Sequence, residues 1–283
     1  MIPRTVHDAI SVGVVSVDTF DAVATFAAQE SILRADFASL AATTLTDPPI
    51  IAAWQDGSII AAAIDDGLAM SIAGRRDGIE AIATSRSDLA SKLVISGRHD
   101  DVVAVMTMID QPRLLRPEHF MTVRRGEVEV ATARVPIRVA TEHDLPLLEE
   151  ARIRALEEEY QLEVPRGGTL HHDLADALAR AVAVQGVAIW CEDEHIAFTA
   201  QLIAKTPDVA IFGDLYTDPL LRGAGRATRG LAAFCAWLMT ESEYVALRVG
   251  VDNLPAKRLY DRVGFQVIEA FASSLRSDAR HPS

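Results

Sequence analysis

The sequence predicts a mixed α/β protein with two domains, and three observations point to it. At 283 residues with 49% hydrophobic content, the chain is long enough for two ordinary domains. Strand-like and helix-like segments alternate along its length. A glycine-rich turn, Arg222 to Gly225, joins a strand-like segment to a helix-like one. The polar, alternating segment 123–134 predicts the boundary, giving an N-terminal domain at 1–130 and a C-terminal domain at 134–283.

The N-terminal domain begins with a helix-like segment at residues 20–35. Residues 50–54 and 58–63 predict two strands of a hairpin, because they flank Gln55-Asp-Gly57 and an Asp-Gly pair is typical of tight hairpin turns. Residues 89–95 and 102–108 indicate further alternation of elements.

The sequence of the C-terminal domain predicts a more regular series of strands and helices. Thr141 is a candidate cap for its first helix, Pro146 fits the first turn, and Gly186 ends the second helix. The expected strands are 135–140, 187–191, 196–204, 210–217, 244–249 and 265–273, and the expected helices are 144–160, 172–184, 227–239 and 255–263. The resulting order is β-α-α-β-β-β-α-β-α-β.

Composition excludes several classes of protein. The formal charge of −13 argues against a nucleic-acid binder, which needs a basic face. No apolar run is long enough for a transmembrane helix, and the first residues do not resemble a signal peptide. The two cysteines, Cys191 and Cys235, suggest core packing rather than a disulfide framework or a metal site. We therefore expect a cytoplasmic protein that uses no metal and contacts no membrane.

The turn at 222–225 is the strongest candidate binding feature. Gly223 and Gly225 allow tight folding, so that several N–H groups converge at the N-terminus of the following helix. Such a point attracts anions, and Arg222, Arg226 and Arg229 add positive charge near it. A diphosphate is the expected guest, although glycines in this pattern also serve ordinary tight turns.

Two motifs carry a resemblance to a known family. Arg222-x-x-Gly-x-Ala227 resembles the acyl-CoA signature of the GNAT N-acetyltransferases, and Asn253-x-x-Ala-x-x-Leu-Tyr260-x-x-x-Gly-Phe265 is similar to the closing motif of that superfamily. The resemblance covers roughly residues 134–275. It implies the GNAT fold, a mixed central sheet flanked by helices, for the C-terminal half.

The N-terminal half is then expected to be a second, diverged copy of the same fold, as in tandem GNAT proteins. Its echo of the phosphate turn, Arg75-Arg-Asp-Gly78, lacks a small residue two positions after the glycine. Any acyl-CoA site there is therefore expected to be defunct. An unrelated α/β interaction domain is the alternative.

The resemblance also implies a set of residues that bind acetyl-CoA as co-substrate. The backbone of Leu215 to Thr217 would pair with the pantetheine arm, and Asn253 would orient the cofactor, act as a helix N-cap, or do both. The full set is Leu215, Tyr216, Thr217, Arg222, Gly223, Ala224, Gly225, Arg226, Ala227 and Asn253.

Tyr260 and Asp214 are the expected catalytic residues. Tyr260 matches a family tyrosine that protonates the leaving thiolate, and its alternative role is packing on a helix. Asp214 lies inside an apolar strand, where a carboxylate could accept a proton, or could be a hydrogen-bonded residue with no chemical role. Glu158 and Glu159 are expected to contact the acceptor substrate, although three acids at 157–159 also suit a solvated helix face.

These residues together predict an N-acetyltransferase that moves an acetyl group from acetyl-CoA to an amine of a small molecule or peptide by direct transfer. The expected partners are acetyl-CoA and this amine, and the expected assembly is a monomer or homodimer. A non-catalytic acyl-CoA sensor or interaction module is the alternative, and an enzyme for a longer acyl group is a variant of the first reading.

Overall fold

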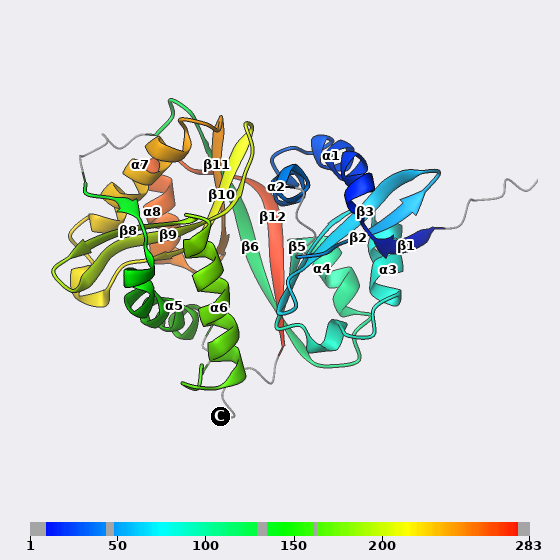
Figure 1. Cartoon of the computed structure of the whole chain (residues 1–283), viewed down its shortest axis with the longest axis horizontal. Helices are drawn as coiled ribbons and strands as arrows, with labels where there is room; N and C mark the ends of the chain where they lie inside the picture. Colours follow the sequence, from blue (N-terminus) through cyan, green and yellow to red (C-terminus); the bar gives the residue numbers. More distant parts are fainter. Residues whose placement is uncertain (1–9, 44–47, 129–134, 161–162, 277–283) are drawn as a thin grey trace, which may run out of the picture. The chain divides into compact units, whose positions relative to one another are not determined.

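The computed structural model describes residues 10–43, 48–128, 135–160 and 163–276, which fold as two compact units (Figure 1). The first unit runs to Pro117 and also takes in Phe271 to Arg276, and the second extends from Glu118 to Ala270. The chain passes between the units inside a strand on both occasions. The predicted boundary between residues 130 and 134 lies outside the described residues.

The first unit contains a sheet in the order β1-β2-β3-β4-β5-β12. All neighbouring strands in it are antiparallel except β4 and β5, which are parallel. Its elements are β1 (Ser11–Val14), η1 (Val17–Thr19), α1 (Phe20–Ala28), α2 (Ala35–Thr43), β2 (Ile50–Gln55), β3 (Ser58–Asp65), β4 (Ala69–Gly74), α3 (Arg76–Thr84), η2 (Leu89–Ser91), β5 (Val94–Arg98), α4 (His99–Met106) and the start of β6 (Arg113–Arg124).

Two apolar clusters cover the faces of this sheet. On one face α1 and α2 pack through Phe26 and Phe37, whose rings meet edge to face with centroids 5.8 Å apart. On the other face α3 and α4 contribute Ile79, Ile82 and Val102, which are almost fully buried. Helices therefore flank both faces, as the sequence predicts for an α/β domain.

The single helix predicted at residues 20–35 is wrong, because the segment forms α1, a turn, and the start of α2. Arg34 is the physical reason, and it is 8% exposed. Its guanidinium lies over the Phe26 ring at 4.0 Å and donates a hydrogen bond of 2.9 Å to the Phe26 carbonyl oxygen. That contact satisfies a carbonyl near the end of α1 and holds the chain in a turn. The hairpin at Asp56-Gly57 is confirmed, with left-handed φ at both residues.

The second unit contains a sheet in the order β6-β11-β10-β9-β8-β7, antiparallel throughout except for the parallel pair β10 and β11. Its order of elements confirms the predicted series. The elements are β7 (Arg138–Val139), η3 (Glu142–Asp144), α5 (Leu145–Tyr160), α6 (Thr169–Ala183), β8 (Val187–Glu192), β9 (His195–Lys205), β10 (Val209–Tyr216), η4 (Pro219–Leu221), α7 (Arg226–Leu238), β11 (Tyr244–Gly250), α8 (Leu254–Val263) and β12 (Gln266–Arg276).

Helices also cover both faces of the second sheet (Figure 1). On one face α7 and α8 bury an aromatic group in which Phe212 meets Phe234, Tyr260 and Phe265 edge to face. The stripe of α7 residues that enters this cluster has the helical spacing expected of an amphipathic helix, and it consists of Leu231, Phe234, Cys235 and Leu238. On the other face α5 and α6 pack on β8 and β10.

The two units share one strand pattern. In each, three antiparallel strands precede a parallel pair, two helices separate the first strand from the second, and one helix joins the parallel strands. The sixth strand, however, comes from the other half of the sequence. Residues 271–275 of β12 follow α8 but pair with β5 in the first unit. Residues 118–124 of β6 follow α4 but pair with β11 in the second unit.

Candidate active site

The turn between β10 and α7 has the geometry of an anion site. Gly223 and Gly225 adopt left-handed φ of 81° and 74°, and Gly225 is the N-cap of α7. The space beside both glycines is open, since an added Cβ would meet no atom within 4 Å. Among the described residues, the N–H groups of 223–228 donate to no acceptor. Unpaired N–H groups and the positive end of a helix dipole therefore meet at one exposed point.

The three arginines of this turn already have partners in the same unit. Arg222 donates to the Thr217 carbonyl and forms an ion pair of 2.9 Å with Glu158 of α5. Arg226 forms an ion pair of 2.6 Å with Glu192 at the end of β8. Arg229 lies over the Trp190 ring, with its guanidinium carbon 5.5 Å from the centroid.

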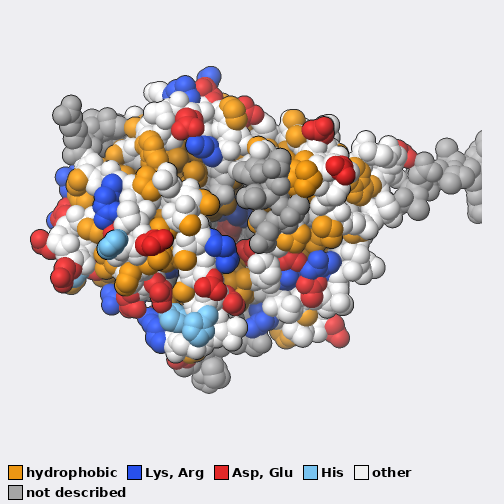
Figure 2. Space-filling model, viewed as in Figure 1, with side chains coloured by type: hydrophobic (Ala, Val, Ile, Leu, Met, Phe, Trp, Pro, Cys, Tyr) orange, Lys and Arg blue, Asp and Glu red, His pale blue; other side chains and the backbone are white. Residues whose placement is uncertain are grey.

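Figure 2 shows acidic and basic side chains interspersed over the face that it draws. An anion at the turn would replace Glu158 as the partner of Arg222 and Glu192 as the partner of Arg226. Such exposed pairs are worth little, so they are easily exchanged.

The parallel ladder between β10 and β11 stops short of the strand ends. Its pairs run from Val209–Tyr244 to Phe212–Leu247, while β10 continues to Tyr216 and β11 to Gly250. On the opposite edge, β10 contains a bulge against β9, between the pairs Gly213–Gln201 and Tyr216–Thr199. The bulge turns the end of β10, and the strands separate beyond Phe212. The glycine-rich turn at residues 222–225 follows this same end of β10.

Asp214 is the bulged residue, with a left-handed φ of 51°. Aspartate tolerates that conformation better than most residues. Its carboxylate forms an ion pair with Arg152 of α5, and the same Arg152 nitrogen donates to the Gln201 side chain at 3.0 Å. The sequence-predicted base is therefore engaged by a guanidinium in this conformation.

The segment from Leu215 to Thr217, predicted to pair with pantetheine, turns two of its side chains inward. Tyr216 and Thr217 are buried, and the Thr217 hydroxyl donates to the Ala197 carbonyl at 2.9 Å. Leu215 is half-buried against the α7 and α8 cluster. Burial raises the pKa of the Tyr216 phenol. The buried side chains of Tyr216 and Thr217 thus anchor this stretch.

Tyr260 lies beside the point at which the ladder ends. It projects from α8, is 7% exposed, and its ring centroid lies 6.5 Å from that of Phe212. Desolvation in this aromatic cluster raises the pKa of the phenol, and the charge of Glu159 adds to the shift. The hydroxyl therefore retains its proton at neutral pH.

The remaining predicted residues occupy the edges of the site. Asn253 is the N-cap of α8, with its side-chain oxygen accepting from the Ala256 N–H at 3.2 Å, which confirms the capping alternative. Glu158 and Glu159 are exposed near the end of α5, and Glu158 contacts Arg222. Sequence reasoning missed Arg152 and Gln201, because their meeting with Asp214 depends on contacts between distant segments.

Two whole-chain features complete the description. No helix within the described residues is both long and apolar enough to cross a membrane. In the same residues, no group of three or more histidine, cysteine, aspartate or glutamate side chains is arranged to hold a metal ion.

Comparisons with known proteins agree with this geometry. The model of the acetyltransferase (GNAT) family matches residues 150–265. No curated protein matches the chain. A GCN5-related N-acetyltransferase from Sphaerobacter thermophilus has a similar structure, with a TM-score of 0.56 and 17% identity over 95% of this chain and 96% of that one.

Two further solved structures are similar over nearly the whole chain. A tandem GNAT protein of the clavulanic acid biosynthesis pathway gives a TM-score of 0.54 and 13% identity over 97% of this chain and 100% of that one. An acetyltransferase of the GNAT family from Colwellia psychrerythraea gives 0.52 and 7% over 94% and 98%. Residues 150–265 of the second unit therefore match a GNAT acetyltransferase domain, which supports the acetyltransferase class for this chain, and the solved structures share its fold.

Proposed function

We propose that the chain transfers an acetyl group from acetyl-CoA to an amine of a small molecule or peptide, at one site in the second unit. One observation carries the proposal. A turn with unpaired N–H groups at the start of α7 follows the end of β10, where the pairing of β10 with β11 has already stopped. A diphosphate and an extended amide-bearing arm, joined as in coenzyme A, match those two features in that order.

Three groups of residues hold the acyl carrier in this proposal. The N–H groups from Gly223 to Ala227 bind the diphosphate, with Arg222 and Arg226 adding charge. The backbone from Leu215 to Thr217 pairs with the pantetheine amides along the free edge of β10. Asn253 supports this arrangement through its cap on α8.

Acetyl-CoA supplies a thioester, whose C–S bond breaks as the C–N bond of the amide forms. Tyr260 donates its proton to the departing sulfur, because its buried phenol starts neutral and lies where β10 and β11 part. The attacking nitrogen loses a proton, and Asp214 is the sequence-predicted acceptor. Its carboxylate would have to leave Arg152 to take that proton.

The acceptor amine approaches from the side of α5 in this proposal. Glu158 and Glu159 are exposed there and carry the negative charge that attracts an ammonium group. Binding of a diphosphate at Arg222 would release Glu158 from its ion pair and leave the carboxylate available to the acceptor.

The test is calorimetric titration of the whole protein with acetyl-CoA, followed by a panel of primary amines. Gly225→Trp places a large side chain at a left-handed position inside the turn, so its acetyl-CoA binding should be lost. Arg76→Trp is the control, an exposed position at the start of α3, the matching helix of the first unit. It should bind as the wild type does.

One site per chain and turnover with an amine would support the proposal. Binding without turnover on a broad panel would favour an acyl-CoA sensor instead. A second site would mean that the first unit also binds acetyl-CoA, and no binding by the wild type would refute the proposal.

A further inference from the structure

The Arg152 side chain contacts both strands at the β10 bulge. It projects from α5, and one of its terminal nitrogens reaches Gln201 on β9 at 3.0 Å and the carboxylate of Asp214 on β10. Gln201 is the β9 residue directly opposite Gly213, where regular pairing ends, and Asp214 is the first residue inside the bulge. The guanidinium therefore spans the point at which the register changes.

The environment favours a tight contact. The Arg152 side chain is 21% exposed, and its Nε atom is buried without a partner among the described residues. Neighbouring Leu148 and Ala151 of α5 are buried in the cluster that packs on β8 and β10. A charge held this way interacts more strongly with its partner than a fully solvated one. Asp214, whose side chain is 39% exposed, thus has its ion-pair partner on α5 while it adopts a left-handed φ.

We infer that Arg152 is a positioning residue that, with Gln201 and Asp214, holds the β10 bulge in the form that receives the acyl-bearing arm. The inference rests on the proposed acetyl-CoA site. Asp214 and Leu215 together face the single β9 residue Ala200, so regular pairing cannot hold them. Without the contact of Arg152 with Asp214 and Gln201, here called the clamp, their backbone loses the partner that fixes it, and the turn of β10 away from β11 after Phe212 is no longer held. Asp214 then acts through Arg152 on the shape of the site.

The clamp is expected to affect binding of the pantetheine arm of coenzyme A but not binding of its 3′-phospho-ADP part. 3′-phospho-ADP is coenzyme A without its pantetheine arm, so it requires the phosphate turn and not the opening between β10 and β11. Arg152→Met should weaken acetyl-CoA binding about tenfold and leave 3′-phospho-ADP binding unchanged, because a hydrogen bond to a charged group is worth roughly this factor. Gly225→Trp should abolish binding of both.

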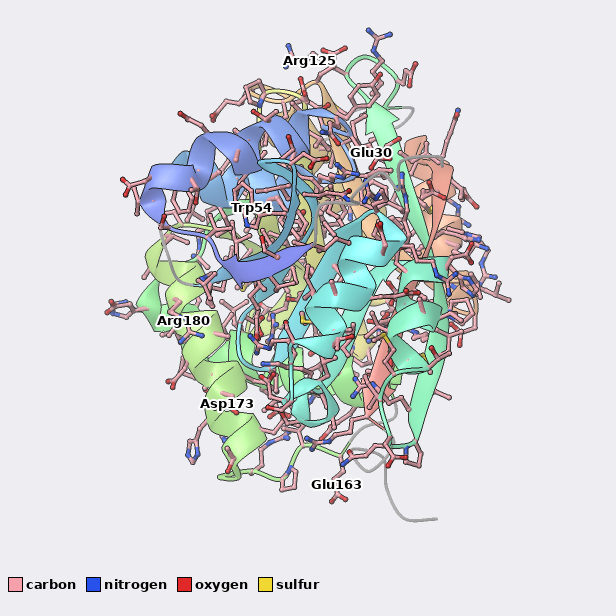
Figure 3. All side chains as sticks on the ribbon, turned by 90° about the vertical axis from the view of Figure 1, so that its right-hand side faces the viewer. Glu30, Trp54, Arg125, Glu163, Asp173 and Arg180 are labelled. Carbon is pink, nitrogen blue, oxygen red and sulfur yellow. The ribbon has the colours of Figure 1, made fainter. Side chains whose placement is uncertain are left out.

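The second readout concerns Asp214. Asp214→Asn keeps a residue that tolerates left-handed φ but removes the charge. It should weaken acetyl-CoA binding as Arg152→Met does, and the double variant should be no weaker than either single one, because all three break the same pair. Arg152→Lys should restore part of the affinity. Arg180→Met, an exposed arginine on α6 labelled in Figure 3, is the charge-matched control and should bind as the wild type.

Calorimetry with both ligands and the steady-state kinetics of each variant decide the question. Additive losses in the double variant, or an unchanged acetyl-CoA affinity in Arg152→Met, would overturn the clamp. A fall in kcat for Asp214→Asn with unchanged KM for acetyl-CoA, and loss of the acidic limb of its pH profile, would also overturn it and make Asp214 the base. Failure of the wild type to bind acetyl-CoA would instead count against the proposed function. Retained 3′-phospho-ADP binding shows that the Arg152 and Asp214 variants are folded.

Discussion

The strand-to-helix turns of the two units occupy the same place in the same topology and differ in every feature that an acyl carrier needs. In the second unit, a long turn separates Tyr216 from Arg226 and leaves N–H groups open. In the first, Arg75 alone separates β4 from α3. Asp77 sits on the start of that helix, accepting from the Gly78 N–H at 2.9 Å and from Arg75 at 2.7 Å. A carboxylate of the protein already occupies the position of the anion.

The parallel strands also differ between the units, because β4 and β5 stay close together beyond their last pair. In the first unit β3 and β4 pair without a bulge. Past the last β4–β5 pair, Gly97 stays so close to β4 that an added Cβ would lie 2.7 Å from the Ile72 carbonyl oxygen. The strands thus remain together where β10 and β11 separate. Shared topology therefore does not bring a shared site, because the site depends on one bulge and one glycine-rich turn.

Each half of the sequence supplies a strand to the other unit, since β12 pairs with β5 and β6 pairs with β11. Separating the halves should therefore have the largest effect on folding. Expressed separately, residues 1–130 lack β12 and residues 134–283 lack β6, so β5 and β11 each lose a neighbour. The exposed edges should make both halves aggregate, and the two should form a soluble 1:1 complex when produced together. Light scattering and circular dichroism would measure this.

A fragment that keeps β6 serves as the control for the separated C-terminal half. Residues 113–265 keep β6 and omit β12, so this fragment retains the complete β6-to-β7 sheet and should fold alone. Independent folding of residues 134–283 would mean that β6 is dispensable, and the two halves would then be separable.

The glycine-rich turn and the helix cap could be predicted from the sequence, but the exchange of β6 and β12 between the two units could not. Gly223, Gly225 and Asn253 work through neighbours a few residues away, so their spacing alone predicts the turn and the cap. The choice of β6 as the partner of β11 depends on pairing between segments over a hundred residues apart. The contact of Arg152 with Asp214, and that of Arg34 which interrupts the expected helix, likewise arise only in the folded chain.

The second comparison concerns the helix that follows each parallel pair. Counted from the start of α8 and of α4, Tyr260 and Val105 occupy the same position, and both are buried. Only the second unit therefore offers a hydroxyl there. Tyr260→Phe keeps the ring and should lower kcat about 100-fold, with little change in acetyl-CoA affinity. Steady-state kinetics measure the effect, with Tyr244→Phe as the control. Unchanged kcat would leave Tyr260 a packing residue.

The N-terminal caps before the first helices of the two units differ in charge. In the second unit Asp144 accepts from the Thr141 N–H at 2.8 Å and from both terminal nitrogens of Arg138 at 2.7 Å. In the first unit, Thr19 accepts from the Ser16 N–H at 3.1 Å without a charge. The Arg138 hydrogen bonds, followed by those from Thr141, hold the pKa of Asp144 below its usual value.

A carboxylate with a lowered pKa stabilises the fold fully above its unfolded pKa, about 4, and less as the pH falls toward its folded value. Asp144→Asn should therefore reduce the free energy of unfolding by about 1 kcal/mol at pH 7, and by less at pH 3. Urea titrations at both values measure the difference. Thr19→Val should show a loss that does not depend on pH. An equal loss at pH 3 and pH 7 for Asp144→Asn would contradict the charged role.

The smallest expected effect is on acetyl-CoA affinity, and it comes from the different ion-pair partners of Arg75 and Arg222. Arg75 is bound to Asp77 within its own turn, whereas Arg222 pairs with Glu158 on a separate helix, where both side chains are nearly half exposed. A diphosphate must displace Glu158, so Glu158→Gln should tighten acetyl-CoA binding about threefold, and Arg222→Gln should weaken it. The gain should disappear in high salt, because screening already weakens the competing pair. Weaker acetyl-CoA binding by Glu158→Gln would mean that the carboxylate orders Arg222 for its ligand, and the exchange between Glu158 and the diphosphate would be excluded.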